Sequence, residues 1–230
     1  MQVQQIGLNQ ETTVDTSLDR QFAAPKPQRP SQATGTMVRQ LTAADSKRLL
    51  THFLSLDDDD RVLRFGQRTN DTVVENYVRS IDFVNDAVFG VFDSRLKLIG
   101  VGHLAYLPVR NEDEPRTAEF GLSVLREARG TGVGSALFAR AAMRSRNAGV
   151  GTLYMHCLSH NATMMHIARK AGMDIHRDYG EADAYLTLPP ADSASILGEM
   201  FQEQAAVFDY ALKRQVRHAN KFLESLIPTF

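Results

Sequence analysis

The sequence predicts an α/β protein of the α+β type, in which a mixed central sheet of six to seven strands is flanked by helices and followed by a long C-terminal helix. Three observations support this fold class. Strand-like apolar runs and segments with helical spacing follow one another between residues 37 and 188. A glycine-rich turn separates one such strand from a long glycine-free helical segment. Apolar residues make up 43% of the chain and charged residues 23%, as in ordinary globular proteins.

The composition divides the 230-residue chain into three parts. Residues 1–35 are rich in Gln, Thr, Pro and Ser, which indicates a flexible N-terminal tail. Residues 36–190 contain the strand and helix patterns and form the expected globular domain. Residues 191–230 follow two prolines and form a C-terminal helical extension.

Bulk properties exclude several classes of partner and location. The net charge of −1 gives no basic surplus for nucleic-acid binding. No apolar run approaches the ~20 residues of a membrane helix, and the N-terminus has no signal-peptide pattern. Cys157 is the only cysteine, so no intrachain disulfide can form and a reducing compartment is expected. We therefore predict a cytoplasmic protein without nucleic-acid or membrane partners.

The first elements of the domain are one strand and two helices. We expect the strand at 37–41 and the helices at 43–56 and 69–83. Between the helices lies a run of four aspartates, 57–60, which we interpret as a solvated turn at a helix end.

The middle of the domain is rich in strands. Runs at 87–92 and 97–107 are separated by a short polar segment and predict a hairpin. A polar loop at 110–116 leads to a strand at 118–125. The glycine-rich turn then opens a helix that ends near Asn147.

The last elements alternate again before the extension. We expect a strand at 152–158, a helix at 161–172, and two short strands at 173–179 and 184–188. A long helix then begins near Ser193. Its apolar stripe comprises Leu197, Phe201, Phe208, Leu212, Val216 and Leu223. We expect the stripe to pack on its own domain, and a homodimer through this helix stays open.

The glycine-rich turn is the strongest functional signal in the sequence. Gly130, Gly132 and Gly134 fall directly at the start of the helix, after Arg129. The first turn of a helix has unpaired N–H groups that favour anions, and glycine lets the backbone approach a ligand closely. The turn therefore predicts a phosphate-binding site, whereas tight packing of the helix on a strand is the alternative.

Two common phosphate-binding motifs do not fit this turn. A Walker P-loop requires lysine after its last glycine, but Ser135 follows Gly134 here. A dinucleotide fingerprint requires glycine at position 135 and a parallel βαβ start, and neither is present.

The segment Arg129-Gly-Thr-Gly-Val-Gly134 resembles the R/Q-x-x-G-x-G/A signature of the GNAT superfamily of N-acetyltransferases. The preceding strand, AEFGLSVL, is similar to the fourth strand of that family. The later segment NATMMHIARKAGM resembles its N-x-x-A-x-x-L-Y-x-K-x-G-F helix. The resemblance covers about 37–189 and implies the GNAT fold for the 36–190 domain.

This resemblance implies acetyl-CoA as the co-substrate and no metal. It implies that the loop and helix start hold the pyrophosphate and that a backbone amide near Val124 or Leu125 stabilises the oxyanion. Asn161 resembles the asparagine that the family uses against the pantetheine arm. The loop residues concerned are Arg129, Gly130, Thr131, Gly132, Val133, Gly134 and Ser135.

Glu119 is the expected general base. Alternation along the strand places Glu119, Gly121 and Ser123 on one face, where two small residues leave room for a ligand. Some members of the family carry a base on this strand. The alternative is a strand-end carboxylate that pairs with a basic residue such as Arg116.

One residue departs from the family pattern. The tyrosine that often protonates the leaving thiolate falls at Ala168. His156, Cys157 and Ser159 are the alternative proton donors, although a lone histidine or cysteine in an apolar strand usually belongs to the core. The spacing of the three histidines at 156, 160 and 166 fits no common zinc pattern.

The acceptor remains open. Residues 55–65 share Arg61, Arg64 and Phe65 with a stretch of bacterial protein-lysine acetyltransferases. Protein lysine and small amines, including polyamines, all remain candidates for direct transfer. A non-catalytic acyl-CoA-binding or sensing module is the alternative function.

Overall fold

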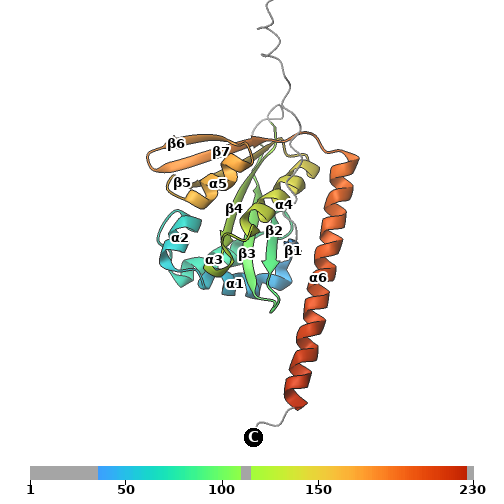
Figure 1. Ribbon diagram of the computed structural model, residues 1–230. Coiled ribbons are helices and arrows are strands. Elements are labelled where there is room, and N and C mark those ends of the chain that lie inside the picture. The colour runs from blue at the N-terminus through green and yellow to red at the C-terminus, as the bar shows by residue number, and fades with distance from the viewer. Residues whose placement is uncertain (1–35, 110–114, 227–230) are drawn as a thin grey trace, which may run out of the picture. The chain divides into compact units, whose positions relative to one another are not determined.

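The computed structural model describes residues 36–109 and 115–226, with side chains described up to residue 220. The predicted tail at 1–35 and most of the predicted loop at 110–116 lie outside the described residues. Seven strands form one mixed sheet, as expected, in the order β1-β2-β3-β4-β5-β7-β6 (Figure 1). The strands are β1 Arg39–Leu41, β2 Ala87–Phe92, β3 Leu98–Tyr106, β4 Thr117–Val124, β5 Thr152–Leu158, β6 Asp174–Asp178 and β7 Glu181–Thr187.

Six α-helices accompany the sheet within the described residues. They are α1 Ser46–Leu54, α2 Asp58–Phe65, α3 Asp71–Ser80, α4 Val133–Asn147, α5 Ala162–Lys170 and α6 Ser193–Leu226. Alternation of side chains along the strands gives the sheet two apolar faces. One face packs against α4 and α5, with Phe120 and Leu137 fully buried. The other packs against α1 and α3 through residues such as Phe53 and Val74.

The acidic run does not end a helix but begins one, so the prediction of a solvated turn is wrong. Asp57 caps α2 by accepting a hydrogen bond from the Asp60 backbone N–H at 2.9 Å. Aspartates in the first turn also suit the positive end of the helix dipole. Gly66, with φ +76°, ends α2 as a left-handed cap.

β4 and β5 separate partway along their length. They pair in parallel from Thr117 with Thr152 to Glu119 with Tyr154, and the pairing ends there. β4 continues to Val124 paired with β3 alone, while β5 continues paired with β7. A wedge therefore opens between the two strands beside the start of α4 (Figure 1).

The α6 helix packs with a face other than the predicted stripe. Its contacts with the domain are polar or aromatic, because Glu199 and Glu203 pair with buried Arg140 and Tyr210 stacks on Phe92. Phe201 and Phe208 of the stripe are 73% and 72% exposed. The expectation that the stripe packs on its own domain is therefore wrong for its described side chains.

Candidate active site

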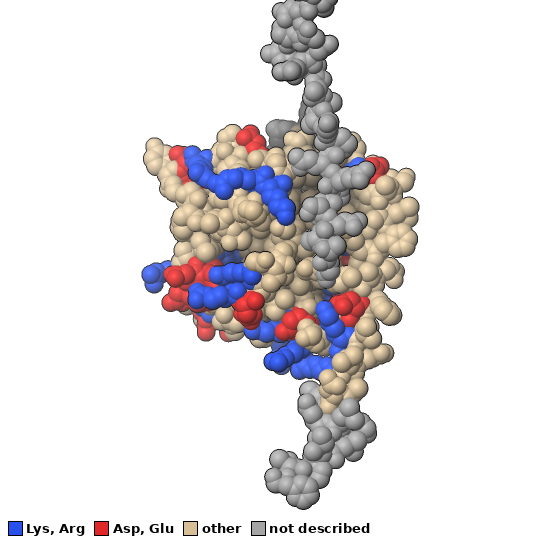
Figure 2. All heavy atoms as spheres, viewed as in Figure 1, with Lys and Arg blue, Asp and Glu red and all other residues tan. Residues whose placement is uncertain are grey.

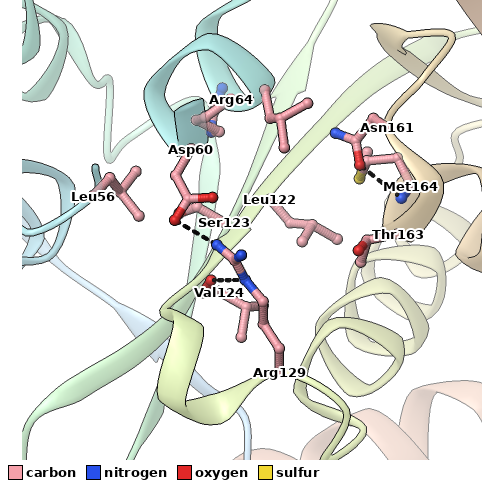
Figure 3. A pocket seen from close by; sticks show the side chains of 11 residues that line it. Leu56, Asp60, Arg64, Leu122, Ser123, Val124, Arg129, Asn161, Thr163 and Met164 are labelled. Carbon is pink, nitrogen blue, oxygen red and sulfur yellow. Dashed lines mark hydrogen bonds and ion pairs between the residues drawn. The ribbon is translucent and has the colours of Figure 1, made fainter. Parts of the chain in front are cut away.

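The wedge between β4 and β5 contains a cavity of about 80 Å³ (Figure 3). Its lining comes from α2 and the segment before it, the end of β4, Arg129 and the N-terminal part of α5 with its cap. The lining residues are Leu56, Asp60, Leu63, Arg64, Leu122, Ser123, Val124, Arg129, Asn161, Thr163 and Met164. Of the predicted phosphate-binding loop only Arg129 lines the cavity, and Glu119 does not line it but shares its strand face with Ser123, which does.

Glycine is required at the three positions of the turn for different structural reasons. Gly130 and Gly132 adopt φ +73° and +88°, and a Cβ at either would meet nothing within 4 Å. Gly134 has ordinary backbone angles, but a Cβ there would lie 3.0 Å from Ile167 Cδ1 of α5. Gly132 is the N-cap of α4 and has no side chain to cap the first turn. The first turn of α4 therefore has no capping side chain and open space beside Gly130 and Gly132, whereas Gly134 serves packing.

The residues between these glycines mostly support the loop. The Thr131 hydroxyl donates to the Ala128 carbonyl at 2.7 Å. Val133 is 4% exposed and packs in the core, and Ser135 lies partly buried in the first turn of α4. Their contribution to a bound anion would come chiefly through backbone N–H groups.

Arginines beside the loop are paired with the acidic run of α2. The Arg129 guanidinium lies 2.5 Å from the Asp60 carboxylate, and its Nε donates to the Val124 carbonyl at 3.2 Å (Figure 3). Arg126 forms a matching pair with Asp57 at 2.6 Å. Figure 2 shows Lys and Arg intermixed with Asp and Glu in the lower part of the molecule. The sequence predicts that the positive charge of Arg129 contributes to phosphate binding. In the structure, the Asp60 carboxylate already compensates this charge.

The backbone of β4 distinguishes the two candidate oxyanion donors. The Leu125 N–H donates to the Ile99 carbonyl at 2.9 Å, so this amide is already engaged. Because alternate strand residues direct their N–H groups to opposite neighbours, Val124 and Leu122 direct theirs toward the wedge. The geometry therefore favours Val124 over Leu125.

Glu119 lies at the closed end of the wedge, where the pairing of β4 with β5 stops. It is the last residue of β4 that pairs with β5, opposite Tyr154, and its side chain is exposed. It forms no ion pair with the described residues. The alternative partner, Arg116, instead donates to the Ala148 carbonyl at 3.0 Å.

A buried serine–histidine pair lies deeper on the same face. His52 Nε2 lies 2.7 Å from Ser123 Oγ, and Nδ1 lies 2.9 Å from the Leu98 carbonyl. Because a carbonyl can only accept, Nδ1 carries the proton and Ser123 donates its O–H to Nε2. Burial lowers the pKa of His52 to about 4, so the imidazole is neutral at neutral pH. The free lone pairs of Ser123 then face the cavity as acceptors.

A second polar network connects the cavity to Asp86. Arg64 Nη2 donates to the Tyr77 hydroxyl at 2.5 Å, and this hydroxyl lies 2.9 Å from His103 Nδ1. His103 Nε2 lies 2.9 Å from Asp86 Oδ2. Burial raises the pKa of Tyr77 and lowers the pKa of His103, which keeps both groups neutral between the two charges.

The remaining predicted residues occupy the α5 side of the wedge. Asn161 caps α5 by accepting from the Met164 N–H at 3.1 Å, and it also lines the cavity. Ala168 is fully buried. Cys157 belongs to the core, as expected for a lone cysteine in an apolar strand, and burial raises the pKa of its thiol. His156 is held by Asp183 at 2.8 Å.

Sequence reasoning did not predict His52 and His103 as residues of the site, and it named Arg64 and the acidic run that contains Asp60 without predicting their contacts. The sequence did contain a signal for His52, because this polar residue occupies a core position of a helix, next to Phe53. His103 similarly interrupts an apolar strand. Their partners, however, lie 46 and 17 residues or more away in sequence.

The described residues were also searched for features of other protein classes. They contain no cluster of three or more His, Cys, Asp or Glu side chains suited to a metal ion. None of their helices combines the length and hydropathy needed to cross a bilayer.

Known structures share this fold at low sequence identity. The GNAT domain of Streptomyces lividans PAT is 20% identical, with a TM-score of 0.57 over 70% of this chain and 99% of that one. Arabidopsis thaliana NAA60 in complex with acetyl-CoA is 15% identical, with a TM-score of 0.51 over 66% and 98%. Salmonella typhimurium yncA with its cofactor acetyl-CoA is 12% identical, with a TM-score of 0.52 over 70% and 98%.

A family model provides the assignment itself. Residues 48–173, more than half of the chain, match the model of the acetyltransferase (GNAT) family. The match begins within α1 and ends three residues after α5, and so includes the wedge and the glycine turn. The chain therefore belongs to the GNAT acetyltransferase family.

Proposed function

We propose that the protein is an acetyl-CoA-dependent N-acetyltransferase that moves the acyl group directly from the thioester to a primary amine. The observation that carries this proposal is the wedge between β4 and β5, which opens beside a helix start that has no capping side chain and open space next to its two glycines. This arrangement offers an anion site and an unpaired strand edge next to one cavity. Two solved structures of the same fold are described as acetyl-CoA complexes, which agrees with this donor.

The donor would be held mainly by backbone groups. Its pyrophosphate fits the amides at Gly130–Ser135, where two glycines leave the approach open. The extended arm would run along the free edge of β4 towards Asn161 on α5. Arg129 donates to Val124 on that edge, so this hydrogen bond would be replaced when the arm binds.

The chemical step requires a neutral amine. An alkyl amine with a pKa of ~10.4 is neutral in only about one molecule in a few thousand at pH 7. A general base contributes ~10²–10⁴ in rate, which is comparable in scale to that deficit. Glu119 is the proposed base, because it is exposed where β4 and β5 begin to separate and has no ion-pair partner among the described residues.

The tetrahedral intermediate requires a hydrogen-bond donor for its oxyanion. The proposed donor is the Val124 amide, which the alternation of β4 directs into the wedge. The leaving thiolate needs no obligatory acid, since a thiol with a pKa near ~8.5 is a tolerable leaving group. This accounts for activity despite Ala168.

Calorimetric titration with acetyl-CoA and with CoA, followed by thiol release over a panel of amines, amino acids and lysine peptides, tests the proposal. Micromolar binding with thiol release is the expected result. Binding without release on any acceptor would favour the non-catalytic acyl-CoA module, for which the absence of a thiolate acid at Ala168 is the supporting observation. No binding would mean that the glycines serve only local packing.

A further inference from the structure

Arg64 is a restrained guanidinium at the cavity wall. Its Cζ lies 5.2, 5.3 and 5.7 Å from the ring centroids of Tyr77, Phe65 and Phe53. Its Nη2 donates to Tyr77, whereas its buried Nε has no hydrogen-bond partner among the described residues. Aromatic faces attract a guanidinium but leave its N–H groups available.

The guanidinium lies directly against β4. A Cβ placed on Gly121 would be 3.2 Å from both Cζ and Nη1 of Arg64. Gly121 shares its strand face with Glu119 and Ser123. Arg64 therefore reaches the face from which the proposed base would act, and glycine at 121 leaves room for it.

Charge compensation distinguishes Arg64 from its neighbours. Within the described residues Arg61 pairs with Asp71 at 2.8 Å, and Arg126 and Arg129 pair with the acidic run. Arg64 has no carboxylate within ion-pair distance in this part of the chain. Asp86 is separated from it by the neutral groups of Tyr77 and His103.

The cavity lining contains one other pair of charges, Asp60 with Arg129, and these compensate each other. Arg64 therefore contributes the net charge of the described lining. Burying a guanidinium without a partner is costly, and its planar fork fits a carboxylate best. Ser123 beside it presents an acceptor, since its O–H is donated to His52. A hydrogen-bond acceptor next to a cation is complementary to a substrate whose amino group lies close to a carboxylate.

We propose that Arg64 binds a carboxylate of the acyl acceptor, so that the acceptor is an amino acid or a similar amino-carboxylate rather than a plain amine or polyamine. This inference rests on the proposed function. A carboxylate could also arrive on the acyl chain of the donor. The acceptor is the assigned source because Arg64 lies on the Glu119 face of β4, opposite the face covered by α4.

The test compares amino acids with the amines formed by their decarboxylation, for example lysine with cadaverine and phenylalanine with phenethylamine. Thiol release is measured with wild type, Arg64→Met, Arg64→Lys and the exposed neighbouring control Arg68→Met. We expect wild type to prefer the amino acid of each pair. Arg64→Met should lower kcat/KM for the amino acid about 10- to 100-fold, mainly through KM, and lower it much less for the amine. Arg64→Lys should be intermediate and Arg68→Met unaffected.

A preference of wild type for the decarboxylated amines, or equal loss on both members of a pair in Arg64→Met, would overturn the inference. A second arm compares acetyl-CoA with succinyl-CoA on one acceptor. If the Arg64 variants lose activity with succinyl-CoA but not with acetyl-CoA, Arg64 binds the carboxylate of the donor, and the assignment to the acceptor is wrong.

Binding separates this inference from the proposed function. Amino acids are titrated into wild type and Arg64→Met saturated with CoA, where no turnover can occur. Binding that needs both the carboxylate and Arg64 supports the inference even if no thiol release is found. Equal affinity of the two variants overturns it even if the enzyme is active. Matching thermal unfolding of the variants shows that α2 remains folded.

Discussion

The arginines on the two sides of the wedge differ in whether their charge is compensated. On the donor side, Arg126 and Arg129 are neutralised by aspartates of α2, and the anion site consists of backbone amides. On the acceptor side, Arg64 keeps its charge, Glu119 has no ion-pair partner among the described residues, and neutral histidines hold the surrounding groups. Under the proposed function, local backbone geometry would define donor binding, whereas side chains assembled from distant segments would define acceptor recognition.

The largest expected effect concerns the acceptor side. Glu119→Gln should lower kcat about 10²- to 10⁴-fold and leave the affinity for CoA within a factor of about two, because the amide cannot accept a proton. Stopped thiol-release assays and calorimetry measure the two quantities. Glu75→Gln, on the exposed surface of α3, is the matched control. If Glu119→Gln keeps the full rate, another group is the general base, and His103 is the next candidate to test.

The buried histidine of the acceptor side predicts a pH dependence of stability. His52 has an ordinary value of 6.5 when exposed and a pKa of about 4 when folded. Between these values the unfolded chain binds the proton and the folded chain does not, so stability falls as pH drops from 6.5 to 4 and is then constant for this group. The loss is about 3 kcal/mol.

His52→Gln should remove most of that slope, with a smaller slope left by His103, whose pKa is also lowered by burial. Denaturant unfolding at a series of pH values from 4 to 7 measures it. The exposed His160→Gln is the control and should keep the wild-type profile. An unchanged slope in His52→Gln would mean that His52 is protonated at about the same pH in both states.

The donor side can be broken at a single backbone position. Gly132→Val should weaken CoA binding by about 10-fold or more, since a left-handed conformation costs a side chain ~1–2 kcal/mol and the amides of the first turn would shift. Gly180→Val is a close control, because φ is +94° and a Cβ there also meets nothing within 4 Å. It should lose similar stability without losing CoA affinity. Equal affinity in both variants would remove the pyrophosphate assignment.

This difference between the two sides also explains what the sequence could and could not predict. The strand, turn and helix from Thr117 to Asn147 were predictable, because alternation, glycine and helical spacing are local signals. The start of α2 was misinterpreted although Asp57 and the acidic first turn are a local cap pattern. A run of like charges at the boundary of two helices fits an end as well as a beginning.

The side-chain networks were beyond local reasoning. His52 contacts Ser123 across 71 positions of sequence, and Arg129 contacts Asp60 across 69. Such pairs depend on how α1 and α2 pack on the sheet, which no short motif specifies. The α6 stripe shows the same limit, since the helix is anchored by Arg140 and Tyr210 rather than by its most apolar face.

The smallest expected effect tests whether Arg129, once freed from its ion pair, can bind the polyphosphate of CoA. Asp60→Asn removes the partner of Arg129 and frees its guanidinium for the polyphosphate of CoA. Because Arg129 is 38% exposed, the gain is screened, and CoA should bind only about two- to five-fold more tightly, with a steeper dependence on salt. Asp59→Asn removes the same charge from the exposed surface of the run without releasing an arginine, and it isolates the contribution of Arg129. If Asp60→Asn binds CoA more weakly than Asp59→Asn, the ion pair positions the loop, and the donor side depends on side chains after all.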